Sequence, residues 1–219
     1  MRESKRVLII LGGIYHDFEG FTSAMKPVLE ANGYIVEATY DLDKLTTLRA
    51  SPYGLVLSYT SLSRHREGEG DTHPESLTPE QTASLAHWVR TGGALLTVHC
   101  GTVTGRDNPA FKALAGGVFV EHPPQFSFMV YPILPEHPIT EGVGAFSVKD
   151  EFYIQDYEEG LDVHMVAVHE GVAYPMVWSK QECAGRVAHI AMGHSEAVWE
   201  LAPYQRLMRN TVDWLTRSY

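Results

Sequence analysis

The chain has 219 residues, of which 44% are hydrophobic and 20% charged, a size that suits one large hydrophobic core. We therefore expect a single domain over residues 1–219. Its 17 lysines and arginines stand against 27 acidic residues, which gives a net charge of −10. Such a charge repels the phosphates of a nucleic acid and an anionic membrane surface, so neither is an expected partner.

Short motifs exclude several further classes of protein. The first apolar run ends at Leu11 with two glycines, too soon for a signal peptide, and no later run is long enough to span a bilayer, so we expect a cytoplasmic location. Cys100 and Cys183 form no C-x-x-C pair, which argues against a disulfide framework or a zinc finger. The sequence has no G-x-G-x-x-G and no Walker loop, so no nucleotide cofactor is expected.

The first part of the chain alternates predicted strands and helices. Residues 6–11 form a continuous apolar run, which indicates a strand buried on both faces of a parallel sheet. A helix follows over residues 19–32, with Pro27 inside the pattern as the sign of a kink or of a late start. Strands are then predicted at 34–40 and 53–59. This order is typical of βαβ units.

A long polar segment separates the third predicted strand from the next helix. Residues 60–77 are rich in Glu, Gly, His and Ser, and we interpret them either as a lid or as a solvated loop. The helix start that follows has Thr78 as its cap, Pro79 at the first helical position and Gln81 placed to close a capping box. This helix is predicted to end at Thr91, before two glycines.

The second part of the chain begins with a buried strand at 94–98 and a short helix at 108–115. Short strands between proline and glycine turns follow, and we interpret them as candidates for antiparallel pairing. A last helix opens at Pro203 with its apolar residues on one face, which suits packing on a sheet. The predicted fold is α/β, with a mostly parallel central sheet and extra late strands. These late strands are expected near residues 126–134, 163–169, 175–178 and 186–192.

Two of the predicted strands run directly into histidines. In an open α/β sheet, ligands bind beyond the carboxyl ends of the strands. The strand at 6–11 leads to Tyr15 and His16, and the strand at 94–98 leads to His99. Histidine exchanges protons near neutral pH and is the commonest metal ligand. Either histidine taken alone is equally compatible with a simple hydrogen bond to a loop carbonyl.

The segment around His99 has the outline of a nucleophile elbow, a sharp turn from a strand into a helix. That turn requires a small residue two places after the reactive one, and Gly101 stands two places after His99. His99 is therefore predicted at the tip, which favours acid–base or metal chemistry over a thiol nucleophile. Cys100 is interpreted as a packed thiol, and a cysteine hydrolase is kept as a third hypothesis.

Four further polar residues are candidates for the same site. His194 follows a predicted strand behind a glycine, which lets the backbone approach a ligand. His122 lies in a proline turn, where a surface histidine is the simpler interpretation. Strand alternation would send one of the adjacent acids Asp150 and Glu151 inward, with a capping acid as the alternative. His189 lies within a strand and is expected in the core.

Seven segments, taken in order, match one known family. They cover nearly the whole chain and comprise residues 12–17, 92–99, 116–123, 136–140, 150–153, 175–178 and 185–194. In these segments the chain resembles the trehalose-utilisation (ThuA-like) family. The resemblance implies the flavodoxin-like, three-layer sandwich of the class I glutamine amidotransferases. Cys100 departs from the usual family pattern.

The resemblance also has consequences for the site. True amidotransferases carry a cysteine at the elbow and a histidine after a late strand. Here His99 stands at the cysteine position and His194 resembles the late histidine, so the resemblance implies that glutaminase activity is lost. The site residues that it implies, with acid–base or metal-ligand roles left open, are His16, His99, His122, Glu151 and His194.

The family's association with sugar utilisation suggests two main functions. The leading hypothesis is a hydrolase, lyase or isomerase that moves protons on a trehalose-like disaccharide or a keto-sugar. His16, His99 and His194 would hold a divalent metal, zinc first, and Glu151 as a fourth ligand would also allow iron, manganese or nickel. In this view His99, His194 and Glu151 are the catalytic groups.

The alternative hypothesis is a non-catalytic sugar-binding or regulatory domain. In either case the expected partner is a small carbohydrate, and a homo-oligomer is left open. His122 is a candidate ligand-binding residue in both hypotheses. Aromatic side chains that stack on sugar faces would serve both functions, although the core is the commoner place for such rings. The aromatic candidates are Tyr15, Tyr59, Trp178 and Trp199.

Overall fold

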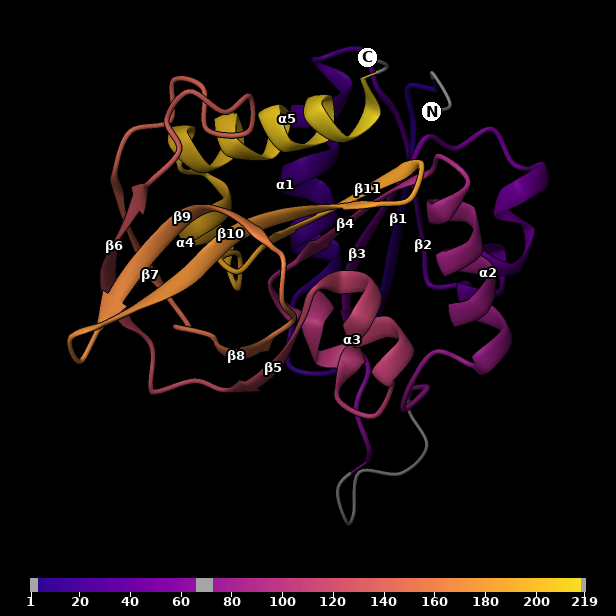
Figure 1. Ribbon diagram of the computed structural model, residues 1–219, viewed down its shortest axis with the longest axis horizontal. Coiled ribbons are helices and arrows are strands. Elements are labelled where there is room, and N and C mark those ends of the chain that lie inside the picture. Colours follow the sequence, from indigo (N-terminus) through magenta and orange to yellow (C-terminus); the bar gives the residue numbers. More distant parts are fainter. Residues whose placement is uncertain (1–3, 66–72, 218–219) are drawn as a thin grey trace.

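The computed structural model describes residues 4–65 and 73–217. A central sheet has helices on both of its faces, so the chain forms a three-layer α/β sandwich (Figure 1). Residues 66–72 of the predicted 60–77 segment lie outside the described residues. No helix in the described ranges combines the length and apolar character needed to cross a membrane.

Within the described residues, nine strands form the central sheet in the order β2-β1-β3-β4-β11-β10-β9-β6-β7. The first five of these pair in parallel, and from β11 onward each strand is antiparallel to its neighbour. The bounds are β1 Arg6–Gly13, β2 Ile35–Thr39, β3 Leu55–Ser61, β4 Ala94–Val98, β6 Phe126–Pro132, β7 Phe146–Asp150, β9 Asp162–His169, β10 Val172–Glu182 and β11 Gly185–Ile190.

The directions of the late strands correct one expectation. β10 and β6 run against the first four strands as predicted, but β11 pairs in parallel with β4, and β9 therefore runs the same way as β4. The reason is topological. β11 inserts beside β4 in the middle of the sheet, so its carboxyl end opens on the same edge as those of β1 and β4.

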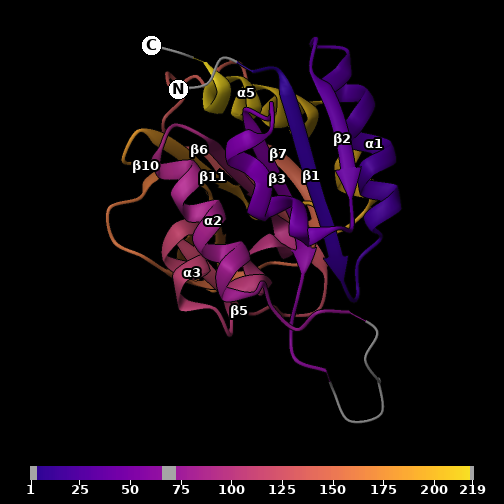
Figure 2. The ribbon, with the colours of Figure 1, turned by 90° about the vertical axis from the view of Figure 1, so that its right-hand side faces the viewer.

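Both faces of the sheet are covered, which explains the unbroken apolar run of β1. Val7, Ile9 and Leu11 face one core with α1 (Phe18–Glu30) and α5 (Ala202–Thr216), whereas Leu8 and Ile10 face a second core with α2 (Pro79–Arg90), α3 (Pro109–Ala115) and the 3-10 segment Leu42–Ala50. In Figure 2, β1 lies between α2 on one side and α1 on the other.

The helix ends follow the expected chemistry closely. Thr78 and Gln81 form both bonds of the capping box, at 3.1 and 2.9 Å, and the helix ends at Arg90. Asp17 caps α1 by accepting from the Gly20 N–H at 2.8 Å. α1 begins at Phe18 and runs through Pro27. Of the two alternatives offered for Pro27, a helix that starts late is therefore wrong.

A small second sheet was not expected from the sequence. It pairs β5 (Gly117–Glu121) with β8 (Ile154–Tyr157) in antiparallel fashion. β5 leads directly into His122, and Glu151 lies between β7 and β8. This ribbon therefore carries residues of the later part of the chain toward the carboxyl ends of the parallel strands (Figure 1).

Candidate functional site

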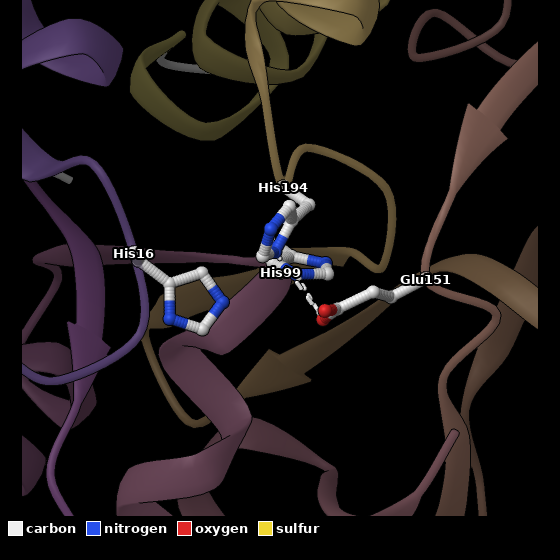
Figure 3. A group of neighbouring side chains, drawn as sticks. All are labelled: His16, His99, Glu151 and His194. Atoms are coloured by element: carbon white, nitrogen blue, oxygen red, sulfur yellow. Dashed lines mark ion pairs between the residues drawn. The ribbon is translucent and has the colours of Figure 1, made fainter. Parts of the chain in front are cut away.

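Four side chains from distant parts of the chain converge at one edge of the central sheet. His16 follows β1, His99 follows β4, Glu151 follows β7 and His194 follows β11. One nitrogen or oxygen of each residue lies within 4.8 Å of those of the other three. Figure 3 shows the three imidazoles and the carboxylate directed toward a common centre.

Backbone carbonyls fix the tautomers of two of these histidines. The Nδ1–H of His16 donates to the Ile14 carbonyl at 3.0 Å, and the Nδ1–H of His99 donates to the Ala191 carbonyl at 2.8 Å. Each ring therefore presents the lone pair of Nε2 to the group. Such outer bonds are the usual means by which metal-binding histidines are oriented.

His99 stands at the tip of a strained turn, as the elbow pattern predicts. Its φ of +44° is in the left-handed region, although it is not a glycine. Gly101 permits this turn, because a Cβ at that position would lie 2.7 Å from the carbonyl oxygen of Ser58. The backbone thus lifts the imidazole of His99 beyond the end of β4.

Glu151 links the histidines to one another. Its Oε2 lies 3.3 Å from Nε2 of His99 and 3.3 Å from Nδ1 of His194. Strand alternation was expected to send one of the two acids inward, but both turn inward: Asp150 is fully buried at the end of β7, and the Glu151 side chain is only 13% exposed.

Burial and neighbouring charge set the protonation of the site. Burial, together with the nearby imidazole of His99, lowers the pKa of His16 to about 3. The contact with Glu151 raises the pKa of His194 above its ordinary value. Burial alone would raise the pKa of Glu151, but the contacts with His194 and His99 outweigh it and lower that pKa.

The donor set fits a metal ion. Nε2 of His99 and Nδ1 of His194 are buried, and the carboxylate of Glu151, 3.3 Å from each, is the partner that they share. One carboxylate oxygen between two buried ring nitrogens leaves these polar atoms poorly satisfied unless something else binds them. His16 remains neutral at ordinary pH, so it offers a lone pair rather than a repelling charge. Three imidazoles and one carboxylate are ligands of zinc and of other divalent transition metals.

A cavity of about 540 Å³ opens beside the four residues, within the size range of small-molecule sites. His122 lines it, with Nε2 at 3.7 Å from Oε2 of Glu151 and with its Nδ1–H donating to the Pro123 carbonyl at 2.8 Å. Its position in the cavity differs from that of a plain surface histidine. The lining also includes Tyr15, Ser61, Ser63, Arg64, Arg106, Asp107, Phe119 and Tyr153.

The aromatic candidates divide between the cavity and the core. Tyr15 lines the cavity and is 58% exposed. Tyr59, Trp178 and Trp199 are buried and do not line it. Trp178 donates to the Ala115 carbonyl and packs against His189. A sugar cannot stack on a covered ring, so the stacking role predicted for Tyr59, Trp178 and Trp199 is corrected to a structural one.

Tyr153 and Arg106 are among the cavity residues that were not predicted as site residues from the sequence. The ring of Tyr153 packs on His99 with 4.0 Å between centroids, and its hydroxyl is 3.5 Å from Nε2 of His16. Tyr153 stands two residues after Glu151, and this position was the feature of the sequence from which its place in the site could have been predicted. Arg106 lies over the ring of Phe119, and no motif marked it. Cys100, in contrast, is fully buried, and burial raises the pKa of its thiol, so it lacks the exposure of a nucleophile.

The strand order and the helix layers define a three-layer α/β protein, consistent with the flavodoxin-like fold that the resemblance implied, with His99 at the tip of its elbow. The family model described as "Trehalose utilisation" (ThuA) matches residues 6–215. The chain therefore belongs to the ThuA family, as the resemblance predicted. This membership supports a role in carbohydrate utilisation.

Solved structures with the same fold are distant in sequence. A putative ThuA-like protein from Parabacteroides merdae has a TM-score of 0.77 at 18% identity, covering 96% of this chain and 89% of that one. A second, from Bacteroides uniformis, has a TM-score of 0.71 at 18% identity, covering 98% and 93%. A cytoplasmic protein from Salmonella typhimurium LT2 has a TM-score of 0.71 at 14% identity, covering 96% and 100%. A search of curated proteins gives no match.

Proposed function

We propose that this protein is a metal-dependent enzyme that acts on a small carbohydrate, a disaccharide or a keto-sugar. The observation that carries the proposal is the arrangement of His16, His99, Glu151 and His194, whose donor atoms lie within 4.8 Å of one another. Two of these atoms, Nε2 of His99 and Nδ1 of His194, are buried and share the carboxylate of Glu151. The ThuA family match supports the carbohydrate as substrate class.

The protein's contribution is a rigid ligand set. The carbonyls of Ile14 and Ala191 hold His16 and His99 in the tautomer that exposes Nε2, and Glu151 contributes the negative charge. Zinc suits three histidines, and the carboxylate extends the choice to iron, manganese or nickel. When bound, such a cation supplies a Lewis acid beside the cavity.

His122 is the residue best placed to exchange a proton with a bound sugar. Its Nδ1–H is committed to the Pro123 carbonyl, so Nε2 is the basic nitrogen, and this atom lies in the cavity 3.7 Å from Glu151. Ser61, Ser63 and Arg106 also line this cavity and offer hydrogen bonds for sugar hydroxyls. A general base must lie within hydrogen-bond reach of the proton that it takes, and Nε2 of His122 meets this condition for a sugar bound in the cavity.

A non-catalytic sugar-binding domain is the alternative, because the same cavity would bind a sugar without turning it over. A cytoplasmic location belongs to the proposal as well, and it is supported by the description of the Salmonella neighbour as a cytoplasmic protein.

A substitution at His122 distinguishes the enzyme from the sugar-binding domain. In an enzyme, His122→Gln lowers turnover by roughly 10²–10⁴-fold with little change in sugar affinity, whereas in a binding domain only affinity can change.

Metal analysis of untagged protein tests the proposal. We expect close to one equivalent of a divalent transition metal after dialysis, and its loss in His99→Ala with the fold retained by circular dichroism. His87→Ala is the matched control, because His87 lies on α2, away from the cluster. Wild-type protein that stays free of metal after incubation with zinc, manganese, iron(II) and nickel would refute the metal site.

A further inference from the structure

Asp150 is a fully buried carboxylate that makes three hydrogen bonds to backbone N–H groups. Its Oδ2 accepts from Gly193 at 2.7 Å, and its Oδ1 accepts from Glu151 at 2.9 Å and from His194 at 3.3 Å. Two of these donors belong to members of the four-residue cluster itself. One side chain at the end of β7 thus connects the backbones that carry Glu151 and His194.

The peptide in front of His194 is also held from its other side. The Gly193 carbonyl accepts from the Tyr59 hydroxyl at 2.9 Å and from the Trp199 indole N–H at 2.6 Å. Gly193 has a φ of +132°, and a Cβ there would lie 2.6 Å from the Tyr204 hydroxyl. Asp150 accepts from the N–H groups of this turn, and Tyr59 and Trp199 donate to its carbonyl. These bonds together fix the backbone conformation at Gly193.

We propose that Asp150 is the positioning residue of the cluster, which holds Glu151 and His194 in register so that their donor atoms meet. This inference rests on the proposed metal site and adds the residue on which its geometry depends. Asp150 is not one of the residues whose donor atoms converge within 4.8 Å, and its two oxygens accept from backbone N–H groups. Its effect on a bound ion is therefore exerted through Glu151 and His194.

The substitution Asp150→Asn tests this role with almost no change in volume. An amide has a single acceptor oxygen, and its NH₂ group would face an N–H of Gly193 or of Glu151, so at least one of the three bonds is lost. Loss of such an outer partner typically weakens metal affinity 10–100-fold. We expect a zinc dissociation constant raised by roughly that factor, in competition with a chromophoric chelator.

Val148→Ala is the matched control, because Val148 is buried on the same strand and bonds to none of these groups. It should lower the melting temperature while zinc affinity stays at the wild-type value. Cobalt(II) absorption adds a readout that a general loss of stability does not move: its band positions and intensities should change in Asp150→Asn but not in Val148→Ala.

The outcomes separate this inference from the proposed function. Wild-type protein that binds no metal defeats the proposed function. Wild-type protein that binds zinc, with Asp150→Asn showing equal affinity and an unchanged cobalt spectrum, overturns the role of Asp150. If Asp150→Asn does not fold, Trp199→Phe removes a donor from the other side of the Gly193 peptide. Weaker zinc binding in that variant supports the positioning of His194, and unchanged binding refutes it.

Discussion

At the scale of single residues, hydrogen bonds outside the cluster decide what the cluster can do. The carbonyls of Ile14 and Ala191 each accept an Nδ1–H, so Nε2 is the free nitrogen of both His16 and His99. Ile14 lies only two residues before His16, but Ala191 lies 92 residues after His99. The residue types were therefore predictable from strand exits, but their tautomers were not.

Metal affinity should rise with pH between about 5 and 8, as deprotonation of histidine frees its ligand nitrogen. Glu151 raises the pKa of His194, so a proton competes with the metal there until the pH exceeds that raised value. His16, with a pKa of about 3, does not compete in this range. Chelator competition at a series of pH values measures the effect, and an affinity independent of pH would contradict it.

The metal-free protein should lose stability as the pH falls from 7 to 5. Burial lowers the pKa values of His16 and His164 to about 3, so between pH 6.5 and 3 their unfolded forms bind protons that the folded forms do not. Stability is therefore full above pH 6.5 and declines below it, by at most about 1.4 kcal/mol per pH unit for each group. The raised pKa of His194 acts in the opposite direction, but only above pH 6.5, where the folded form holds a proton that the unfolded form has lost.

Urea unfolding in the presence of a chelator, at pH 7 and at pH 5, measures this decline. The variant His164→Asn should show a smaller difference between the two pH values than the wild type, because it removes one of the buried neutral histidines. His164 lies outside the cluster and hydrogen-bonds to Ser179, so metal affinity is expected to stay unchanged. Equal pH dependence in the two proteins would contradict the assignment.

At the scale of elements, the turn after β4 shows how a local backbone feature builds the site. Gly101→Ala would place a Cβ 2.7 Å from the Ser58 carbonyl oxygen, a backbone atom of a buried strand that cannot move away. We expect a loss of about 1–3 kcal/mol in the free energy of unfolding. Gly144→Ala is the control, since a Cβ there meets nothing within 4 Å. Urea denaturation of both variants measures the difference.

Most elements were predictable because their signals are local. Apolar runs, capping residues and glycine stops define β1, α2, β4 and α5 within one or two residues of the structure. The β5/β8 ribbon was not predictable, because its strands are short and separated by more than thirty residues that belong to other elements. The same kind of separation hid the role of Asp150, whose partners Gly193 and His194 lie in the turn after β11.

At the scale of the whole molecule, the order of the strands explains which site residues could be predicted from the sequence. β1 and β4 were expected to run in parallel, so the meeting of His16 and His99 follows from the fold class. His194 joins them because β11 also pairs in parallel with β4, which its sequence did not indicate. Tyr59 and Trp178 were assigned to a ligand from their residue type, but depth in the core depends on packing by helices and the late strands.

The position of β7 has a further consequence for folding. It is the outermost strand of the sheet, five places from β4 in the pairing order, yet it delivers Glu151 to histidines that come from the centre. The cluster is therefore complete only when β7 has joined the sheet, and chain segments from residue 16 to residue 194 must all be folded. An ion that binds only the finished set stabilises the native state in proportion to the logarithm of its concentration. The concentration of that ion would then control the fraction of newly synthesised chains that is folded.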